Sequence, residues 1–308
     1  MINRFFPRAR DAFLTLAVAT SASLTGCGGG SGSGASPQQG GGDTPTVSAA
    51  VVGTPMYGQS LVLTLSGSNL AQGIAVSATG CDGVIIDPSS SGPSTARYRC
   101  SVSAIGAGAF TIKRTSGGAV LASAAFTVPA PQVTLAFDNH AGVAGSIVVT
   151  LAPDKTPITV NNFLSYVRSG FYVGTVFHRV SPGFVVQGGG YVAPFDSVTQ
   201  TLKPTGPPIP LEVVKGLSNA QWSISMARAQ DPDTASATTQ FFINLVDNSG
   251  YLDPGVTGGY AVFGTVSGST ADVTAIAGAP CVAIPLVLAS TDCAPTPNIV
   301  IWSAAQTR

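Results

Sequence analysis

Short runs of alternating apolar and polar residues recur along the chain from about residue 47 to its end. Each run has the period of two that is typical of a β-strand with one face buried. Clusters of Gly, Ser, Pro and Asp separate the runs, and the chain has 37 Gly and 22 Pro. We therefore predict a mainly β protein built from short strands and turns.

In the first half of the chain the alternating runs are closely and regularly spaced. This spacing predicts a small antiparallel β-sandwich of immunoglobulin-like type over residues 47–129. No Trp lies between Cys81 and Cys100, so the match to that fold is generic. The predicted strands cover residues 60–65, 74–78, 97–102, 109–113 and 122–128.

A proline-rich joint at residues 129–131 separates this part from a second set of strands. With 308 residues, two domains are expected. About eight short strands follow, and a closed antiparallel barrel over residues 131–308 would remove their exposed edges. The strands expected outside the segment 177–190 cover residues 133–137, 145–151, 211–213, 222–226, 240–245, 260–266 and 298–303.

One helix is predicted after the first two strands of the barrel. Thr156 is a candidate N-cap, Pro157 suits the first helical position, and Gly170 can end the helix. The apolar residues of one helical face are Val160, Phe163, Leu164 and Val167.

Composition narrows the classes of function. The chain has 14 basic and 14 acidic residues, and only 9% of its residues are charged. This balance gives no electrostatic reason to expect a nucleic-acid partner. No Gly-x-Ser-x-Gly or His-Glu-x-x-His motif is present, so the sequence offers neither a nucleophile with its base nor a zinc site.

The first 26 residues read as an export signal. Three arginines precede a short apolar run at residues 12–24, which is too short to span a bilayer. The sequence Leu24-Thr25-Gly26-Cys27 resembles a bacterial lipobox, which implies cleavage before Cys27 and a lipid on its sulfur. Ordinary secretion with a free Cys27 is the alternative. The resemblance to lipoproteins also implies sorting to the outer membrane, because Gly28 and not Asp follows the cysteine. Residues 27–46 read as a flexible tether.

The five cysteines fit this interpretation. An export signal implies an oxidising compartment, where a lone thiol is a liability, and a lipid on Cys27 leaves an even number. The simplest connectivity pairs Cys81 with Cys100 and Cys281 with Cys293. Neither pair has Cys-x-x-Cys spacing, so redox or zinc chemistry is not expected.

The segment 177–190, FHRVSPGFVVQGGG, places polar groups on an apolar surface. Arg179 and Gln187 alternate with large apolar side chains on two runs joined by a Ser-Pro-Gly turn. Such a surface suits a ligand that is apolar but carries an amide. The alternative is a barrel strand whose arginine extends to solvent.

This segment and three later blocks resemble the cyclophilins, in particular their bacterial periplasmic branch. The later blocks are SISMARA at residues 223–229, QFFINL at 240–245, and YLD at 251–253 with YAVFG at 260–264. The resemblance covers about residues 131–308. It implies an eight-stranded barrel capped by helices, and catalysis of cis/trans isomerisation of X-Pro bonds without a cofactor or metal.

The resemblance also implies a role for each matching residue. Arg179 would donate to the prolyl nitrogen, Gln187 would orient Arg179 or bind the substrate carbonyl, and Tyr251 would line the rim. Gln240 and the backbone of Ala227 and Arg228 would hold the flanking peptide extended. The cup for the proline ring would be Phe184, Val185, Phe242, Leu252 and Tyr260.

Other residues in these blocks favour structural roles. Phe177, Phe241 and Phe263 are expected in the barrel core, and His178 as a hydrogen-bonded structural residue. No Gly-Lys-Ser/Thr follows the glycines at 188–190, so a phosphate cradle is not favoured. Calcium binding at the pair Asp231 and Asp233 is not favoured either.

Two positions depart from the family pattern. Many cyclophilins have a tryptophan where Tyr251 stands and a histidine where Tyr260 stands. The resemblance ties that tryptophan to cyclosporin affinity, so drug sensitivity is in doubt while isomerase activity is not.

The leading hypothesis is a monomeric, membrane-tethered peptidyl-prolyl cis-trans isomerase that faces the periplasm and acts on exported proteins. The alternative is a proline-peptide binding or holding module in which the first domain recruits clients and turnover is incidental. A purely structural surface lipoprotein is a third possibility, which the polar residues in the cup disfavour.

Overall fold

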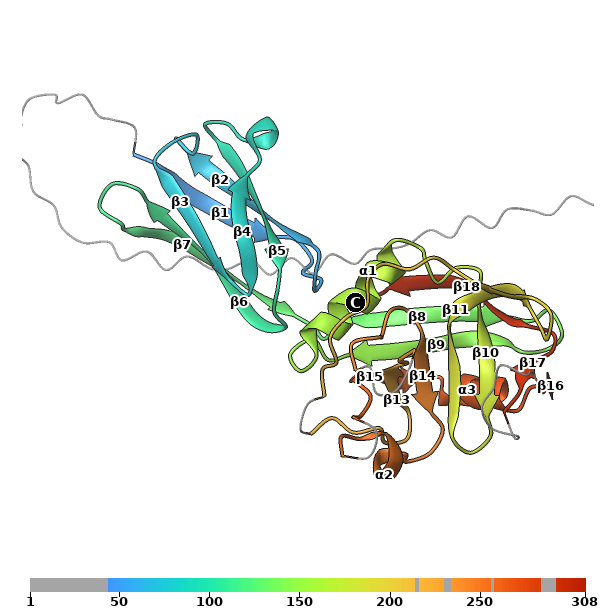
Figure 1. Ribbon diagram of the computed structural model, residues 1–308. Coiled ribbons are helices and arrows are strands. Elements are labelled where there is room, and N and C mark those ends of the chain that lie inside the picture. Colours follow the sequence, from blue (N-terminus) through green and yellow to red (C-terminus); the bar gives the residue numbers. More distant parts are fainter. Residues whose placement is uncertain (1–43, 214–215, 230–233, 256–257, 284–291) are drawn as a thin grey trace, which may run out of the picture.

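The computed structural model describes residues 44–213, 216–229, 234–255, 258–283 and 292–308. They form two lobes, an N-terminal lobe up to Ala130 and a barrel from Pro131 onward (Figure 1). The predicted signal segment, Cys27, most of the tether, and the pair Asp231 and Asp233 lie outside the described residues.

The N-terminal lobe contains two antiparallel sheets, with strand orders β1-β2-β5-β4 and β3-β6-β7. Alternate residues Leu61, Leu63 and Leu65 of β2 are buried, as are Phe110 and Ile112 of β6, so both sheets contribute to the core. The strands are β1 (Thr46–Val52), β2 (Ser60–Ser68), β3 (Ile74–Thr79), β4 (Cys81–Ile86), β5 (Thr95–Val102), β6 (Gly106–Arg114) and β7 (Val120–Val128).

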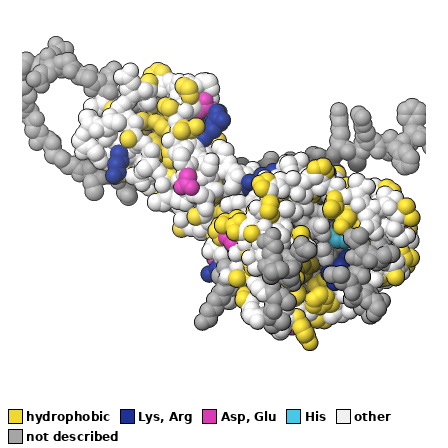
Figure 2. All heavy atoms as spheres, viewed as in Figure 1, with side chains coloured by type: hydrophobic (Ala, Val, Ile, Leu, Met, Phe, Trp, Pro, Cys, Tyr) yellow, Lys and Arg dark blue, Asp and Glu magenta, His cyan; other side chains and the backbone are white. Residues whose placement is uncertain are grey.

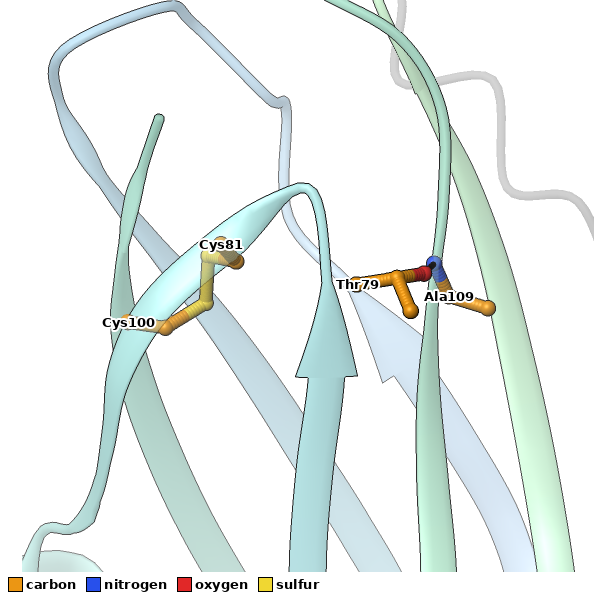
Figure 3. The surroundings of a disulfide bond; sticks show 4 residues. All are labelled: Thr79, Cys81, Cys100 and Ala109. Carbon is orange, nitrogen blue, oxygen red and sulfur yellow. Dashed lines mark hydrogen bonds between the residues drawn. A yellow bond between two sulfur atoms is a disulfide. The ribbon is translucent and has the colours of Figure 1, made fainter. Parts of the chain in front are cut away.

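A disulfide between Cys81 and Cys100 joins the neighbouring strands β4 and β5 (Figure 3). Its Cα atoms are 5.6 Å apart, within the usual range for a disulfide. In the other sheet Ala109 donates its backbone N–H to the Thr79 hydroxyl at 3.1 Å, which ties β6 to β3. The disulfide couples the edge strand β4 covalently to a strand whose inner face is buried.

The second lobe is a closed antiparallel barrel, which confirms the predicted fold. Its eight strands follow the order β10-β18-β8-β9-β15-β13-β14-β11, β11 pairs back onto β10, and β12 is added outside β11. Closure leaves no free edge among these eight strands. The strands are β8 (Gln132–Asp138), β9 (Ala144–Leu151), β10 (Thr175–Ser181), β11 (Val185–Phe195), β12 (Gln200–Leu202), β13 (Ser223–Met226), β14 (Phe241–Asn244), β15 (Val262–Gly268) and β18 (Ile299–Gln306).

Helix α1 (Pro157–Arg168) follows β9 as predicted, but another residue satisfies its first N–H groups. Thr156 occupies the N-cap position and makes no side-chain cap hydrogen bond. Instead the Glu212 carboxylate accepts the backbone N–H groups of Ile158 at 3.2 Å and Thr159 at 2.6 Å. A carboxylate at this end is favoured by the helix dipole. The strand predicted at residues 211–213 is therefore wrong, because this segment crosses the start of α1.

Two further helices cap the barrel, α2 (Ser249–Leu252) and α3 (Thr270–Ala277). Periodicity indicated only α1, whereas the family resemblance implied capping helices. Near the C-terminus the short strands β16 (Cys281–Val282) and β17 (Ala294–Pro295) form a two-stranded ladder, and a disulfide links Cys281 to Cys293. In the part of the chain that the structure describes, no helix is both long and apolar enough to cross a bilayer.

Aromatic side chains fill the barrel between α1 and the sheet. The Phe163 ring lies 5.2 Å from Tyr172, 6.0 Å from Phe241 and 5.0 Å from Phe263. Phe177 packs edge-on against Phe241 at 6.2 Å. Phe177, Phe241 and Phe263 are therefore core residues, as expected from the sequence.

The middle of the glycine run, Gly189, lies directly against this aromatic core. Its φ is +84°, and a Cβ there would approach the Phe241 ring to 2.8 Å and the Tyr172 ring to 2.9 Å. Gly189 thus serves the packing of the barrel, whereas a Cβ at Gly190 would meet the Gln240 side chain at 2.6 Å. Gly174 has the same φ of +84°, but a Cβ there would meet nothing within 4 Å.

We expect Gly189→Ala to destabilise the protein by more than Gly174→Ala. Both changes place a side chain at positive φ, which costs roughly 1 to 3 kcal/mol. Only Gly189→Ala also overpacks the core, which adds about 1 to 3 kcal/mol. Urea unfolding of both variants measures the difference. Equal midpoints would show that the core accommodates the added methyl group without loss of stability.

The two lobes contact each other through a turn of the N-terminal lobe. Arg168, the last residue of α1, donates to the Tyr57 carbonyl at 2.8 Å, and Gln306 donates to the same carbonyl at 3.1 Å. Burial raises the pKa of Tyr57 above its ordinary value, although a hydrogen bond with Asn161 opposes this shift. In Figure 1, α1 and the C-terminus lie on the side of the barrel nearest the N-terminal lobe. The described residues on the face shown in Figure 2 carry few charged side chains, in keeping with the composition.

Candidate active site

A small apolar cluster lies apart from the barrel core on the outer face of β11 and β14. Val185, Phe242 and Leu252 are its buried members. Phe184, Ala227 and Tyr260 pack against them, and the Tyr260 ring meets Phe242 edge-on at 5.5 Å. We call Phe184, Val185, Phe242, Leu252 and Tyr260 the cup.

A chain of polar side chains borders the cup. Arg179 on β10 donates from Nη1 to Oε1 of Gln187 on β11 at 3.0 Å. Gln187 in turn donates from Nε2 to Oε1 of Gln240 at 3.0 Å. Arg179 also donates from Nε to Oδ2 of Asp292 at 2.9 Å. The guanidinium is therefore held in a defined orientation beside an apolar surface.

The cup and Arg179 share one pocket, with a volume of about 430 Å³. Beyond the predicted residues, its wall includes His178, Tyr191, Phe195, Leu202 and Ala229. The His178 ring packs against Tyr191 at 4.8 Å and Phe195 at 5.6 Å. Burial lowers the pKa of His178 to about 3, so the imidazole is neutral near pH 7. His178 therefore adds no positive charge to the pocket next to Arg179.

Buried amides hold the rim of the cup in place. Asn248 donates to the Phe184 carbonyl at 2.9 Å and to Oδ1 of Asn244 at 2.8 Å. Asn219 donates to the Leu252 carbonyl at 3.1 Å and accepts from the Ser225 hydroxyl at 2.7 Å. Buried polar groups with satisfied hydrogen bonds fix local geometry. This network joins β13, β14 and α2 behind the cup.

The chemistry available to this pocket is non-covalent. Its wall combines an apolar cup with two guanidinium groups, those of Arg179 and Arg228, and two amide side chains. Across the described residues, no group of three His, Cys, Asp or Glu side chains is placed to hold a metal ion. An apolar cup beside a fixed cationic donor suits a ligand with a ring or hydrocarbon group attached to an amide.

Comparison with known proteins identifies the barrel. Residues 134–306, more than half of the chain, match the family model described as "Cyclophilin type peptidyl-prolyl cis-trans isomerase/CLD". The chain belongs to the cyclophilin family. Its barrel is a cyclophilin-type peptidyl-prolyl cis-trans isomerase domain.

Bacterial proteins named as peptidyl-prolyl cis-trans isomerases are among the similar curated proteins. The chain is 52% identical over 124 residues to "Peptidyl-prolyl cis-trans isomerase A" of Dickeya dadantii (strain 3937), which covers 40% of this chain and 61% of that protein. It is 45% identical over 131 residues to "Peptidyl-prolyl cis-trans isomerase B" of Escherichia coli (strain K12), which covers 42% of this chain and 73% of that protein. The match to the Dickeya protein thus spans under two thirds of that relative's length.

A solved structure of a Cryptosporidium parvum cyclophilin-type isomerase is also similar. It has 20% sequence identity and a TM-score of 0.44, and the match covers 58% of this chain and 98% of that one. The N-terminal lobe, up to Ala130, lies outside the segment matched by the family model.

Most of the predicted site residues of this cyclophilin domain lie around one pocket. The pocket wall includes all five cup residues together with Arg179, Gln187, Ala227, Arg228 and Gln240. Tyr251, a residue of α2, does not belong to this wall and is 71% exposed. Tyr251 directly precedes the cup residue Leu252, and its role at the rim stays a prediction.

The backbone at Ala227 also differs in detail from the expectation. Its N–H donates to the Gln240 carbonyl at 2.9 Å, so this N–H is already occupied by the sheet. The Arg228 guanidinium lies over the Tyr260 ring at 4.6 Å from the centroid, a cation–π contact that supports one wall of the cup.

No sequence pattern indicates that Asp292 belongs to the site. Asp292 is 113 residues from Arg179 along the chain, and the two meet only because β10 contacts the segment next to Cys293. The one available signal was its neighbour Cys293, which was singled out for its disulfide alone. Phe195 and Leu202 also line the pocket, and they reach it through the β11–β12 hairpin. No local sequence pattern indicates this pairing, so neither residue was predicted.

The buried His178 predicts a pH dependence of stability. The folded protein keeps the imidazole neutral down to about pH 3, whereas the unfolded chain takes up a proton near pH 6.5. The unfolded state therefore binds more protons between these values, and the free energy of unfolding falls as pH drops below 6.5. The slope contributed by one such group is at most about 1.4 kcal/mol per pH unit.

Urea unfolding near pH 7.5 and pH 5 should therefore show a smaller loss of stability for His178→Gln than for the wild type. His140→Gln is the control, because the His140 side chain is 89% exposed in the turn that follows β8. An equal loss in His178→Gln and the wild type would show that His178 does not carry this dependence.

Proposed function

We propose that this cyclophilin is a membrane-tethered isomerase that acts on X-Pro bonds of exported proteins. The observation that carries the catalytic part is the fixed Arg179 guanidinium, which shares one pocket with the apolar cup. The proposal for the tether is carried by the lipobox-like sequence that ends at Cys27.

The reaction needs little chemical machinery. Resonance in the C–N bond gives rotation a barrier of about 18 to 20 kcal/mol, and an uncatalysed X-Pro bond isomerises in tens to hundreds of seconds. No bond forms or breaks in the step, so neither a nucleophile nor an acid/base pair is required. A site that favours the twisted amide is sufficient.

The cup would bind the proline ring, which has no N–H of its own to satisfy. Phe242 and Leu252 would contact the ring, with Phe184 and Tyr260 at its sides. Burial of apolar surface contributes about 25 cal/mol per Å². Binding of the ring would place the X-Pro bond beside the polar border of the pocket.

Arg179 would donate to the prolyl nitrogen as the amide twists. In a planar amide the nitrogen lone pair is delocalised, and it becomes a good acceptor only when rotation breaks the resonance. A hydrogen bond from Arg179 is therefore strongest in the transition state, which is the condition for acceleration. Gln187, bonded to Arg179, would keep the donor in place.

The lipid anchor and the location can be tested together in a bacterial host. Labelled palmitate should be incorporated into the full-length chain, which should sediment with the outer membrane on a density gradient. Cys27→Ser should lose both the label and the sedimentation. Incorporation of label into Cys27→Ser, or an unlabelled wild-type chain, would contradict the anchor.

A second candidate is a module that holds proline-containing clients, with recruitment by the N-terminal lobe. This lobe lies outside the matched family segment, and its exposed large apolar residues include Val51, Ile85, Ile86 and Val120. An Arg179→Ala chain that loses isomerisation yet still suppresses client aggregation would favour this candidate. Loss of both activities would favour the isomerase alone.

Monomeric state and the absence of a nucleic-acid partner remain part of the proposal. Light scattering of the purified chain tests the first. A binding assay with labelled DNA at low salt tests the second, because electrostatic binding to phosphates is strongest there.

A further inference from the structure

One buried ion pair supports Arg179 from behind the pocket. The Asp292 side chain is fully buried, with 0% exposure, whereas the Arg179 side chain is 27% exposed. Asp292 is not part of the pocket wall. Its carboxylate therefore contacts the guanidinium from the protein side, while Arg179 faces the pocket.

The position of Asp292 is fixed by its backbone neighbours. Cys293 and Val180 form an antiparallel bridge, in which Val180 donates to the Cys293 carbonyl at 2.8 Å and Cys293 donates to the Val180 carbonyl at 3.0 Å. Val180 follows Arg179 directly. The disulfide from Cys293 to Cys281 and the β16–β17 ladder hold the same segment. Asp292 thus lies at a defined place beside Arg179.

The two hydrogen bonds of Arg179 restrain its guanidinium plane at two points. Nε donates to Asp292 and Nη1 donates to Gln187, so the head group is bonded through two different nitrogens. The bond to the carboxylate is charge-assisted, and such bonds are about twice as strong as neutral ones. With the Gln187 bond alone, the long arginine side chain would retain rotational freedom.

The burial of the Asp292 carboxylate as a charged group depends on its ion pair with Arg179. A buried charge is costly unless it is paired. Asp292 Oδ1 is buried and makes no hydrogen bond within the described part of the chain, so the guanidinium is the charged partner that offsets burial of this carboxylate. This arrangement favours a persistent contact rather than a transient surface pair.

We propose that Asp292 is a positioning residue for isomerisation, which holds the guanidinium of Arg179 in its donating orientation. The inference rests on the proposed role of Arg179 as the donor to the prolyl nitrogen. Asp292 does not touch the substrate. It acts by orienting Arg179 before the amide twists, so its loss lowers the rate of the step more than it weakens substrate binding.

The test compares Asp292→Asn with the wild type in the full-length chain. A misplaced donor lowers the rate by about 10- to 100-fold, and we expect this loss in kcat, with KM within about two-fold of the wild type. The intact cup keeps KM unchanged. NMR exchange on a proline tetrapeptide at several substrate concentrations separates the two constants.

A spectroscopic signal distinguishes positioning from general damage. In arginine labelled with ¹⁵N, the Nε–Hε signal of Arg179 should be protected from solvent exchange in the wild type and lose this protection in Asp292→Asn. Arg179→Lys assigns the signal by removing it. Asp272→Asn is the matched control, because Asp272 accepts the Ser146 N–H at 3.0 Å on another part of the barrel. It should change neither kcat nor the Arg179 signal.

The outcomes separate this inference from the proposed function. Wild-type kcat in folded Asp292→Asn, or a lower kcat with an unchanged Arg179 signal, would overturn the role of Asp292. If Asp292→Asn does not fold, rapid exchange of the Arg179 Hε in the wild type would overturn it, and slow exchange would support it. Unchanged activity in Arg179→Ala would instead refute the proposed catalytic role of Arg179.

Discussion

Arg179→Ala is expected to lower kcat/KM for a proline tetrapeptide by about 100- to 1000-fold, the usual effect of removing one preorganised donor. Arg179 is the charged donor in the pocket that is bonded to both Gln187 and Asp292, and the twisted amide nitrogen is the group that it would stabilise. A protease-coupled or NMR exchange assay measures the effect.

The same substitution leaves the buried Asp292 carboxylate without its partner, which costs stability. The double variant Arg179→Ala, Asp292→Asn removes both charges and should recover part of the stability without recovering activity. Arg97→Ala, in β5 of the N-terminal lobe, is the control and should retain full activity. Wild-type activity in Arg179→Ala would refute the proposed mechanism.

Phe241 and Phe242 should respond in opposite ways to alanine substitution. They are adjacent in β14, so their side chains point to opposite faces of the sheet. Phe241 is fully buried among Phe163, Tyr172 and Phe177, and its loss should reduce the free energy of unfolding by about 3 to 5 kcal/mol. Urea unfolding measures this value.

Phe242→Ala should instead mainly reduce activity. Phe242 belongs to the cup, where it would contact the proline ring. Loss of roughly 1.5 to 3 kcal/mol of apolar contact corresponds to about a 10- to 100-fold lower kcat/KM. A larger loss of stability in Phe242→Ala than in Phe241→Ala would contradict the division between core and cup.

The barrel was predictable because the alternating runs indicate its strands, and a closed barrel is the arrangement that leaves such strands without free edges. Alternation placed β8, β9 and β18, and the apolar face with Pro157 placed α1. Helix α3 was missed because its sequence, TADVTAIA, is apolar or small on most sides and only Val273 and Ile276 are buried. Strands β1 and β4 were missed because most of their residues are not buried, so the alternation is weak.

The site was predictable where its residues lie in contiguous blocks. The cup, Arg179, Gln187 and Gln240 were found in this way. Asp292 could not be found, because its contact with Arg179 depends on the pairing of Val180 with Cys293, and no local pattern encodes such a bridge. Glu212 was read as part of a strand, although its carboxylate caps a helix that begins more than fifty residues earlier.

The barrel begins and ends at neighbouring positions. Gln132 donates to the Arg308 carbonyl at 3.1 Å, and β8 pairs with β18 along their length. In the ring of eight strands, β8 lies four places from β14, which carries Phe242. Arg179 lies nearer, on β10, which pairs with β18. An accessory module can therefore be attached, exchanged or lost beside β8 during evolution while the cup residues on β11 and β14 keep their arrangement. The same adjacency makes the barrel a natural candidate for circular permutation through residues 132 and 308.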